Sequence, residues 1–183
     1  NDVAVKRWRD IWLNEGFATY FELRYAETHG GSSGEAWLQS SYAARAASSP
    51  FWQVRIARPG ASRLFDSAIY HRGAMTMFAL RNRIGEADFS TLVRTWAATR
   101  AGGNGSTENF MALAESVSGA DLDTFFTAWL FTIGKRTALN HLRDHRREVT
   151  EEAPEQIDFT TPAQAFAEAD QEPPAADQHR GQA

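Results

Sequence analysis

Apolar residues recur at helical spacing through most of the first 131 residues, and glycine-containing breaks separate the periodic segments. This pattern predicts helices over residues 11–29, 32–47, 66–84, 86–101, 107–118 and 121–131. Asp10 is expected to cap the first helix, Ser32 with Glu35 forms a capping-box pattern for the second, and Asp66 starts the third. The segment 51–62 is expected to be a loop. Because no segment alternates with a period of two residues, the predicted fold class is all-α.

The C-terminal stretch, residues 141–183, has a different composition from the rest of the chain. It carries ten acidic and four basic residues, four of the six prolines and only two aromatic residues. Such a segment has too little apolar surface to offset the entropy that ordering costs. We therefore expect two parts: a helical part over residues 1–140 and a polar, proline-containing, disordered tail over 141–183.

Composition and charge narrow the classes of function. The 183 residues include six Trp and twelve Phe, which is enough material for a real core. A net charge of -4 without a concentrated Lys/Arg face argues against nucleic-acid binding. No stretch reaches the roughly 18 consecutive apolar residues of a membrane span. The absence of cysteine excludes disulfides and thiolate zinc sites.

One carboxylate, Glu15, lies in a stretch that is otherwise rich in Trp, Leu, Phe and Tyr. On a helix it shares a face with Ala18, Thr19 and Glu22. The apolar residues expected to point elsewhere, toward a core, are Leu13, Phe17, Tyr20 and Phe21. A buried, unpaired carboxylate is costly, so Glu15 either reaches water, pairs with a cation or binds a metal. Spacing alone leaves these alternatives open.

The string WLNEGFATYFE, residues 12–22, resembles the zinc-ligand segment of the aminopeptidase N-type metallopeptidases. This gluzincin group includes alanyl aminopeptidases and leukotriene hydrolase. In the family, an HExxH helix supplies two His ligands and the Glu of this string is the third ligand. The resemblance implies that Glu15 binds one Zn2+ in the complete enzyme, and that the chain begins just downstream of the HExxH helix. The fold it implies is the C-terminal helical half of a thermolysin-like catalytic domain.

Two further motifs follow in the order that the family has them. The segment Tyr70-His71-Arg72-Gly73-Ala74 looks like the family's Y-x-K/R-G segment. The tyrosine of that segment donates its phenolic proton to the oxyanion of the tetrahedral intermediate, so the resemblance implies that Tyr70 is catalytic. The string SGADLDTFFTAWLFTIGKRTAL, residues 118–139, resembles the segment that closes the family's catalytic domain.

Glu22 lies two helical turns beyond Glu15 on the same predicted face. A carboxylate in this place could accept the free N–H of a zinc-bound His and hold its ring, which is a common arrangement around zinc. The alternative is a surface salt bridge, for example to Arg24 or Lys6.

The favoured interpretation is a zinc-dependent aminopeptidase that hydrolyses N-terminal residues from peptides. Because HExxH is missing from the chain, the chain alone is expected to be inactive. The competing hypothesis is a non-catalytic helical binding module, such as a solenoid piece suggested by the similarity of residues 87–96 to 120–129. Epoxide hydrolysis by a leukotriene hydrolase-like relative would share the zinc site. The sequence does not indicate localisation, oligomeric state or side-chain preference.

Overall fold

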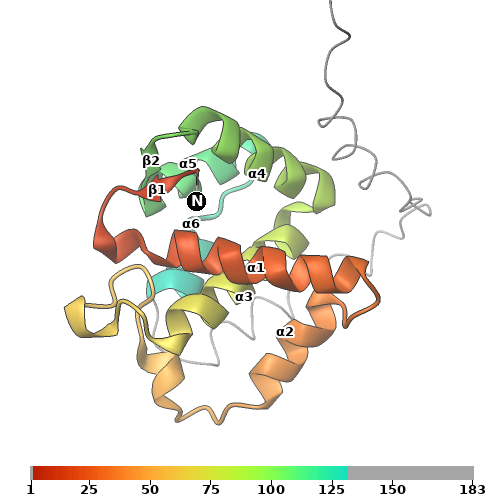
Figure 1. Cartoon of the computed structure of the whole chain (residues 1–183), viewed down its shortest axis with the longest axis vertical. Coiled ribbons are helices and arrows are strands. Elements are labelled where there is room, and N and C mark those ends of the chain that lie inside the picture. The colour runs from red at the N-terminus through yellow and green to blue at the C-terminus, as the bar shows by residue number, and fades with distance from the viewer. Residues whose placement is uncertain (1, 132–183) are drawn as a thin grey trace, which may run out of the picture. The chain divides into compact units, whose positions relative to one another are not determined.

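The computed structural model describes residues 2–131 (Figure 1). Within this range lie the helices α1 (Trp12–Thr28), α2 (Gly34–Ala43), α3 (Ser67–Ile84), α4 (Glu86–Arg100), α5 (Thr107–Ser118) and α6 (Asp123–Phe126), and the strands β1 (Ala4–Val5) and β2 (Asn104–Gly105). The helices confirm the predicted all-α class, and the two-residue strands are a small addition to it. The predicted tail, residues 141–183, lies outside the described residues.

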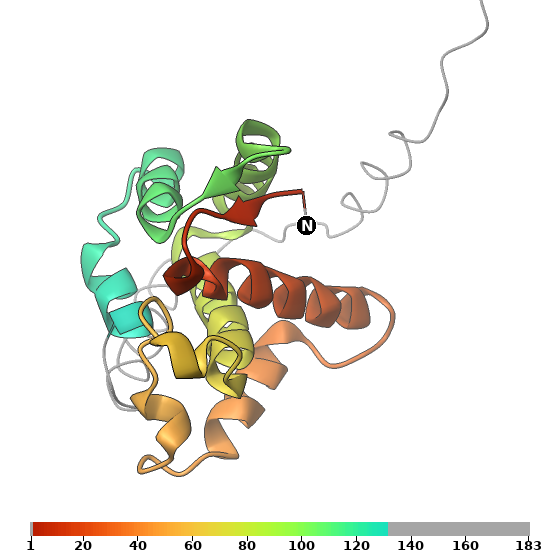
Figure 2. The same ribbon diagram turned by 60° about the vertical axis from the view of Figure 1, so that its left-hand side comes forward.

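The long helices α1 and α3 form the centre of the described fold (Figures 1 and 2). Helix α3 also contacts α2 and α4, and α5 packs on α4. Every residue of α3 from Arg72 to Leu80 is buried, which is the pattern of a helix covered on all sides. Among residues 2–131, no helix combines the length and the apolar character that a bilayer crossing requires.

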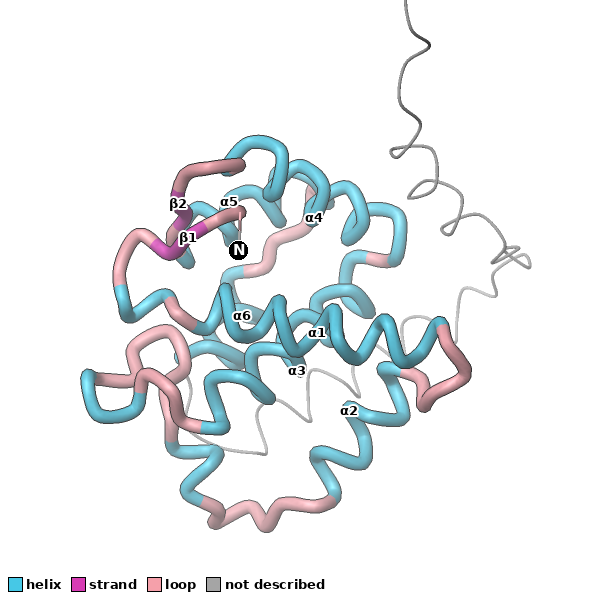
Figure 3. The backbone as a smooth tube through the Cα atoms, viewed as in Figure 1, coloured by secondary structure: helices cyan, strands magenta, loops and turns pink. Residues whose placement is uncertain are grey.

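The two short strands pair in parallel and tie the start of the chain to the connection between α4 and α5 (Figure 3). The Ala4 N–H donates to the Gly103 carbonyl at 2.9 Å, and the Lys6 N–H donates to the Gly105 carbonyl at 2.8 Å. A Cβ atom at Gly105 would overlap the Trp96 ring, so only glycine fits this place without a rearrangement. The pairing fixes the direction in which the chain enters α1.

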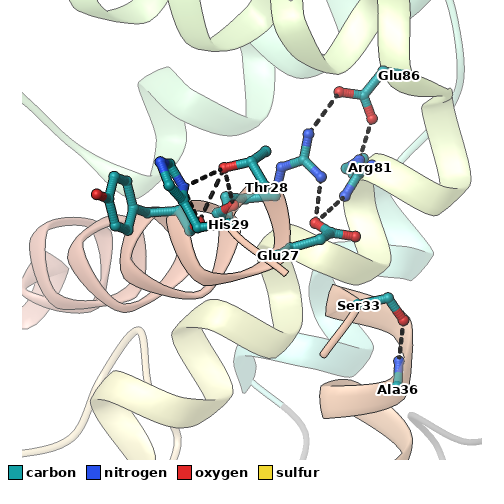
Figure 4. A network of polar contacts seen from close by, with 9 residues as sticks. Glu27, Thr28, His29, Ser33, Ala36, Arg81 and Glu86 are labelled. Atoms are coloured by element: carbon teal, nitrogen blue, oxygen red, sulfur yellow. Dashed lines mark hydrogen bonds and ion pairs between the residues drawn. The ribbon is translucent and has the colours of Figure 1, made fainter. Parts of the chain in front are cut away.

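The N-cap of helix α2 lies one residue later than predicted. Ser33 rather than Ser32 is the cap: its hydroxyl accepts a hydrogen bond from the Ala36 N–H at 3.1 Å (Figure 4). The helix ends at Ala43, before the predicted end at residue 47. The prediction for α3 is confirmed at its start, where the Asp66 carboxylate accepts from the first turn of the helix.

The segment 51–62 contains no α-helix, as predicted, but it supplies part of the core. Two 3-10 turns, Pro50–Gln53 and Ala61–Arg63, lie at its two ends. The side chains that it buries in the core are those of Phe51, Trp52, Val54, Ile56 and Ala57. The buried Arg72 guanidinium donates to the carbonyls of Val54 and Trp129, the latter at 3.0 Å. Burial lowers the pKa of Arg72 to about 10, so it stays charged at neutral pH. Helix α3 therefore anchors both this segment and the end of the described chain.

Asp10 does not cap the first helix, so that prediction was wrong. Its carboxylate is fully buried and accepts hydrogen bonds from the backbone N–H and the hydroxyl of Thr107, at 3.2 and 2.7 Å. Thr107 is the first residue of α5, whose N-terminus favours a negative charge. The Trp12 indole donates to the same hydroxyl at 2.9 Å. Asp10 therefore joins the start of α1 to α5.

We expect Asp10→Ala to lower the free energy of unfolding by roughly 2 to 3 kcal/mol, because the donors of Thr107 would stay buried without an acceptor. Urea denaturation of the 183-residue chain measures this change. Asp2→Ala, at an exposed position, is the matched control and should change stability by less than about 0.5 kcal/mol. Equal stability of the two variants would show that the buried link contributes nothing.

Candidate active site

Helices α1 and α3 cross each other (Figures 1 and 2), and two glycines lie at their contact. A Cβ atom at Gly16 would lie 2.9 Å from the Cα of Gly73, and one at Gly73 would lie 2.7 Å from the Cα of Gly16. The two backbones are therefore in direct contact, which only glycine permits on both sides. Gly16 directly follows Glu15, and Gly73 lies three residues after Tyr70. The crossing brings the first turns of the two helices together.

Glu15 and Tyr70, the two main predicted site residues, lie on these first turns and are both partly buried. Burial raises the pKa of the Tyr70 phenol, and the charge of Glu15 raises it further. Tyr70 therefore keeps its proton throughout the neutral range. Within residues 2–131, neither the Glu15 carboxylate nor the Tyr70 hydroxyl has a hydrogen-bond or ion-pair partner. A carboxylate acceptor and a phenolic donor thus remain available on the first turns of the two crossing helices.

On α1, Glu15 shares its face with the small residues Ala18 and Thr19, as helical spacing predicted. On the other side of the helix, Leu13 and Tyr20 are buried in the core and Phe17 is half-buried. Phe21 was predicted to point toward the core, but its side chain is 48% exposed. Its ring stacks on the Phe17 ring at a centroid distance of 6.0 Å, so a neighbour on the same helix covers it in place of the core.

Glu22 is exposed on the same helix, and the alternative ion pair with Arg24 does not form. Arg24 instead pairs with Glu27 and, at 3.5 Å, with Glu86. Arg81 joins the same network, which links the ends of α1 and α3 to the start of α4 (Figure 4). Within the described part of the chain, Glu22 has no ion pair. Its carboxylate remains available to a group outside these residues.

Among the described residues, Glu15 could supply one ligand of a zinc site. A carboxylate oxygen beside two imidazole nitrogens is a common donor set for catalytic zinc, and the small side chains of Ala18 and Thr19 leave room around Glu15. Among residues 2–131 there is no group of three or more His, Cys, Asp or Glu side chains that could hold a metal ion. Other ligands would have to come from outside the described residues.

Comparison with known protein families gives a direct match: residues 1–129 match the peptidase family M1 domain. The chain belongs to peptidase family M1. It is 30% identical to aminopeptidase N of Streptomyces lividans over an alignment of 146 residues that covers 72% of this chain and 17% of that protein. It is 27% identical to aminopeptidase M1-C of Oryza sativa subsp. japonica over an alignment of 161 residues that covers 83% of this chain and 18% of that protein.

Solved structures of M1 peptidases have the same fold. The M1 zinc metallopeptidase from Deinococcus radiodurans superposes with a TM-score of 0.64 at 30% identity, covering 72% of this chain and 29% of that one. A variant of that protein bound to a Tyr-Ser-Ala substrate superposes with a TM-score of 0.61 at 30% identity, covering 70% and 29%. The chain thus spans less than a third of these M1 proteins, and the predicted family membership is confirmed.

Sequence reasoning had assigned no role to three features of this site. No local sequence pattern indicates that Gly16 contacts Gly73, although both glycines lie inside the M1 motifs. His71 occupies the variable position of its motif, and only the structure shows that Arg45 contacts it. Helical spacing did not indicate that the motif residue Arg72 is buried. Its guanidinium donates hydrogen bonds to two segments that are distant in sequence.

Proposed function

We propose that this chain is the C-terminal helical part of the catalytic domain of a zinc aminopeptidase, which removes N-terminal residues from peptides. The observation that carries the proposal is that a carboxylate, Glu15, and a phenol, Tyr70, lie on the first turns of the crossing helices α1 and α3, and that neither has a hydrogen-bond or ion-pair partner among residues 2–131. M1 membership and the aminopeptidase names of the relatives support it. Residues 1–140 would form the catalytic part, and residues 141–183 a tail outside it.

Each of the three side chains has a defined task in this proposal. Zinc, when bound, would activate a water molecule and polarise the peptide carbonyl. Glu15 holds the ion as its carboxylate ligand. Tyr70 donates from its hydroxyl to the carbonyl oxygen of the substrate as that oxygen gains negative charge, and its raised pKa keeps the donor protonated. Glu22 accepts the free N–H of a zinc-bound imidazole and holds the ring in place.

The 183-residue chain alone should neither retain zinc nor hydrolyse peptides, because its sequence contains no HExxH motif and residues 2–131 hold no group of three or more potential metal ligands. Metal analysis of the purified chain after dialysis should find far less than one zinc per molecule. An assay with aminoacyl p-nitroanilides should show no turnover above background. Stoichiometric zinc together with turnover would contradict this expectation.

The role of Glu15 is tested in the complete protein. Glu15→Gln removes the negative charge of the ligand and should weaken zinc binding by roughly 100-fold or more, with a parallel loss of activity at limiting zinc. Glu108→Gln, the same substitution at an exposed position on α5, is the control and should bind zinc normally. If both variants keep full zinc affinity, the metal assignment fails, and the non-catalytic binding module becomes the better hypothesis.

A further inference from the structure

The ends of α1 and α3 that lie away from the candidate site are joined by four charged side chains (Figure 4). Arg24 pairs with Glu27 within α1, and Arg81 of α3 pairs with Glu86 of α4. Two longer ion pairs close the ring, Arg24 with Glu86 at 3.5 Å and Arg81 with Glu27 at 3.8 Å. These four residues form the charged cluster. Three of its side chains are at most 22% exposed, so solvent screens their charges less than those of surface pairs.

The same three helices also share an aromatic contact. The Tyr20 ring of α1 lies 4.6 Å from the Phe78 ring of α3 and 5.3 Å from the Phe89 ring of α4. Apolar packing of this kind holds the helices together but is non-directional, so it tolerates small tilts. Charge-assisted hydrogen bonds depend on the placement of both partners. The charged cluster is therefore suited to select one tilt among those that the rings permit.

The contact between Gly16 and Gly73 can act as a pivot for α1 and α3. Neither glycine has a side chain, so this contact limits how closely the helices approach but has no interlocking side chains to fix their crossing angle. Arg81 lies eight residues after Gly73, or about 12 Å along the helix axis, and Tyr70 lies three residues before it, or about 4.5 Å. A shift of about 2 Å at Arg81 would thus displace Tyr70 by roughly 0.8 Å.

On the side of the crossing that carries the candidate site, two exposed rings connect the segments that precede the helices. The rings of Trp8, before α1, and Phe65, before α3, have their centroids 6.3 Å apart. The two side chains are 64% and 61% exposed. Rings that lie mostly in water are held by few neighbours, so this contact offers little resistance to a tilt. A tilt set at the charged cluster is therefore carried through to the first turns of α1 and α3.

We propose that the residues of the charged cluster are positioning residues, which set the crossing angle of α1 and α3 and thereby place the Tyr70 hydroxyl relative to the Glu15 carboxylate. In this arrangement no residue of the cluster contacts the substrate or the metal. The proposal rests on the proposed function for its consequence in catalysis. The crossing angle itself can be measured without metal.

Two substitutions open the charged cluster from different sides. Arg81→Met keeps an unbranched side chain and removes the charge, and both carboxylates keep Arg24 as a partner. Glu86→Gln acts from α4, where the side chain is 51% exposed and the risk to folding is small. Arg81→Lys retains the positive charge and tests for rescue. Arg94→Met, at an exposed position on α4, is the matched control.

The first test measures the crossing angle in the zinc-free 183-residue chain by pulsed EPR. Because the sequence contains no cysteine, Tyr25→Cys and Ser67→Cys give two unique spin-label sites, exposed and at opposite ends of α1 and α3. Arg81→Met and Glu86→Gln should each shift the label distance by roughly 2 Å, which is within the scatter of crossing angles. Arg81→Lys and the control should keep the native distance. A native distance in both Arg81→Met and Glu86→Gln would overturn the proposal.

The second test uses steady-state kinetics of the complete protein. Because a misplacement of about 1 Å can cost on the order of 100-fold in rate, Arg81→Met should lower kcat roughly 10-fold, with KM and zinc content nearly unchanged. Arg81→Lys should restore most of the rate. A merely stabilising role would lower the urea midpoint and leave kcat of the folded protein native, which would contradict the proposal. Failure of the zinc assignment would appear separately, as normal zinc affinity in Glu15→Gln.

Discussion

In the complete protein, replacing Tyr70 by Phe should lower kcat by roughly 100 to 1,000-fold and leave zinc content and KM nearly unchanged. The substitution removes one hydroxyl and keeps the ring, which packs against the hydrophobic core. The hydroxyl has no hydrogen-bond partner among the described residues, so its removal breaks no structural contact there. The expected loss arises in the transition state, where the carbonyl oxygen of the substrate carries negative charge. Steady-state kinetics with a peptide substrate, together with metal analysis, separate these quantities.

Tyr25→Phe is the matched control for this variant. Tyr25 lies on α1 with its side chain 66% exposed, so the loss of its hydroxyl should leave kcat within about twofold of the native value. If Tyr70→Phe also kept native kcat, the phenol would not be the donor. A raised KM with native kcat would place Tyr70 in substrate binding alone.

Gly73→Ala should destabilise the fold by roughly 3 kcal/mol or more. The new Cβ atom would lie 2.7 Å from the Cα of Gly16, and both glycines are buried where the two helix backbones touch. No side-chain rotation can relieve such a contact, so α1 and α3 must move apart. Urea denaturation measures the loss of stability. In the complete protein, activity should fall as well, because Glu15 and Tyr70 would separate.

A double-mutant cycle tests whether the crossing causes this effect. Gly16→Ala should cost about as much as Gly73→Ala, and the double variant should cost clearly less than their sum, because one separation of the helices accommodates both methyl groups. Ser116→Ala, at an exposed position on α5, is the control and should change stability by less than about 0.5 kcal/mol. Additive losses at positions 16 and 73 would show that the two glycines act independently.

Much of the secondary structure could be predicted because it depends on local chemistry. Asp66 caps α3, and Gly85 ends it with a φ of 84°, as expected from residues within one turn of each end. Adjacent serines have equal capping propensities, so the choice of Ser33 over Ser32 was not accessible. The Asp10 carboxylate does not cap its own helix. It accepts hydrogen bonds from two buried donors of Thr107, which is distant in sequence.

The sequence by itself determined the helical class and the family motifs, and it singled out Glu15 and Tyr70 as the carboxylate and the phenol of the proposed site. Only the tertiary structure decided that the helical turns that carry these two residues meet, because this depends on a backbone contact between Gly16 and Gly73 that no local pattern encodes. It also decided that His71, at the variable position of its motif, contacts Arg45. Helical periodicity reports which face of one helix is apolar, whereas the depth and place of a crossing depend on the shapes of both helices.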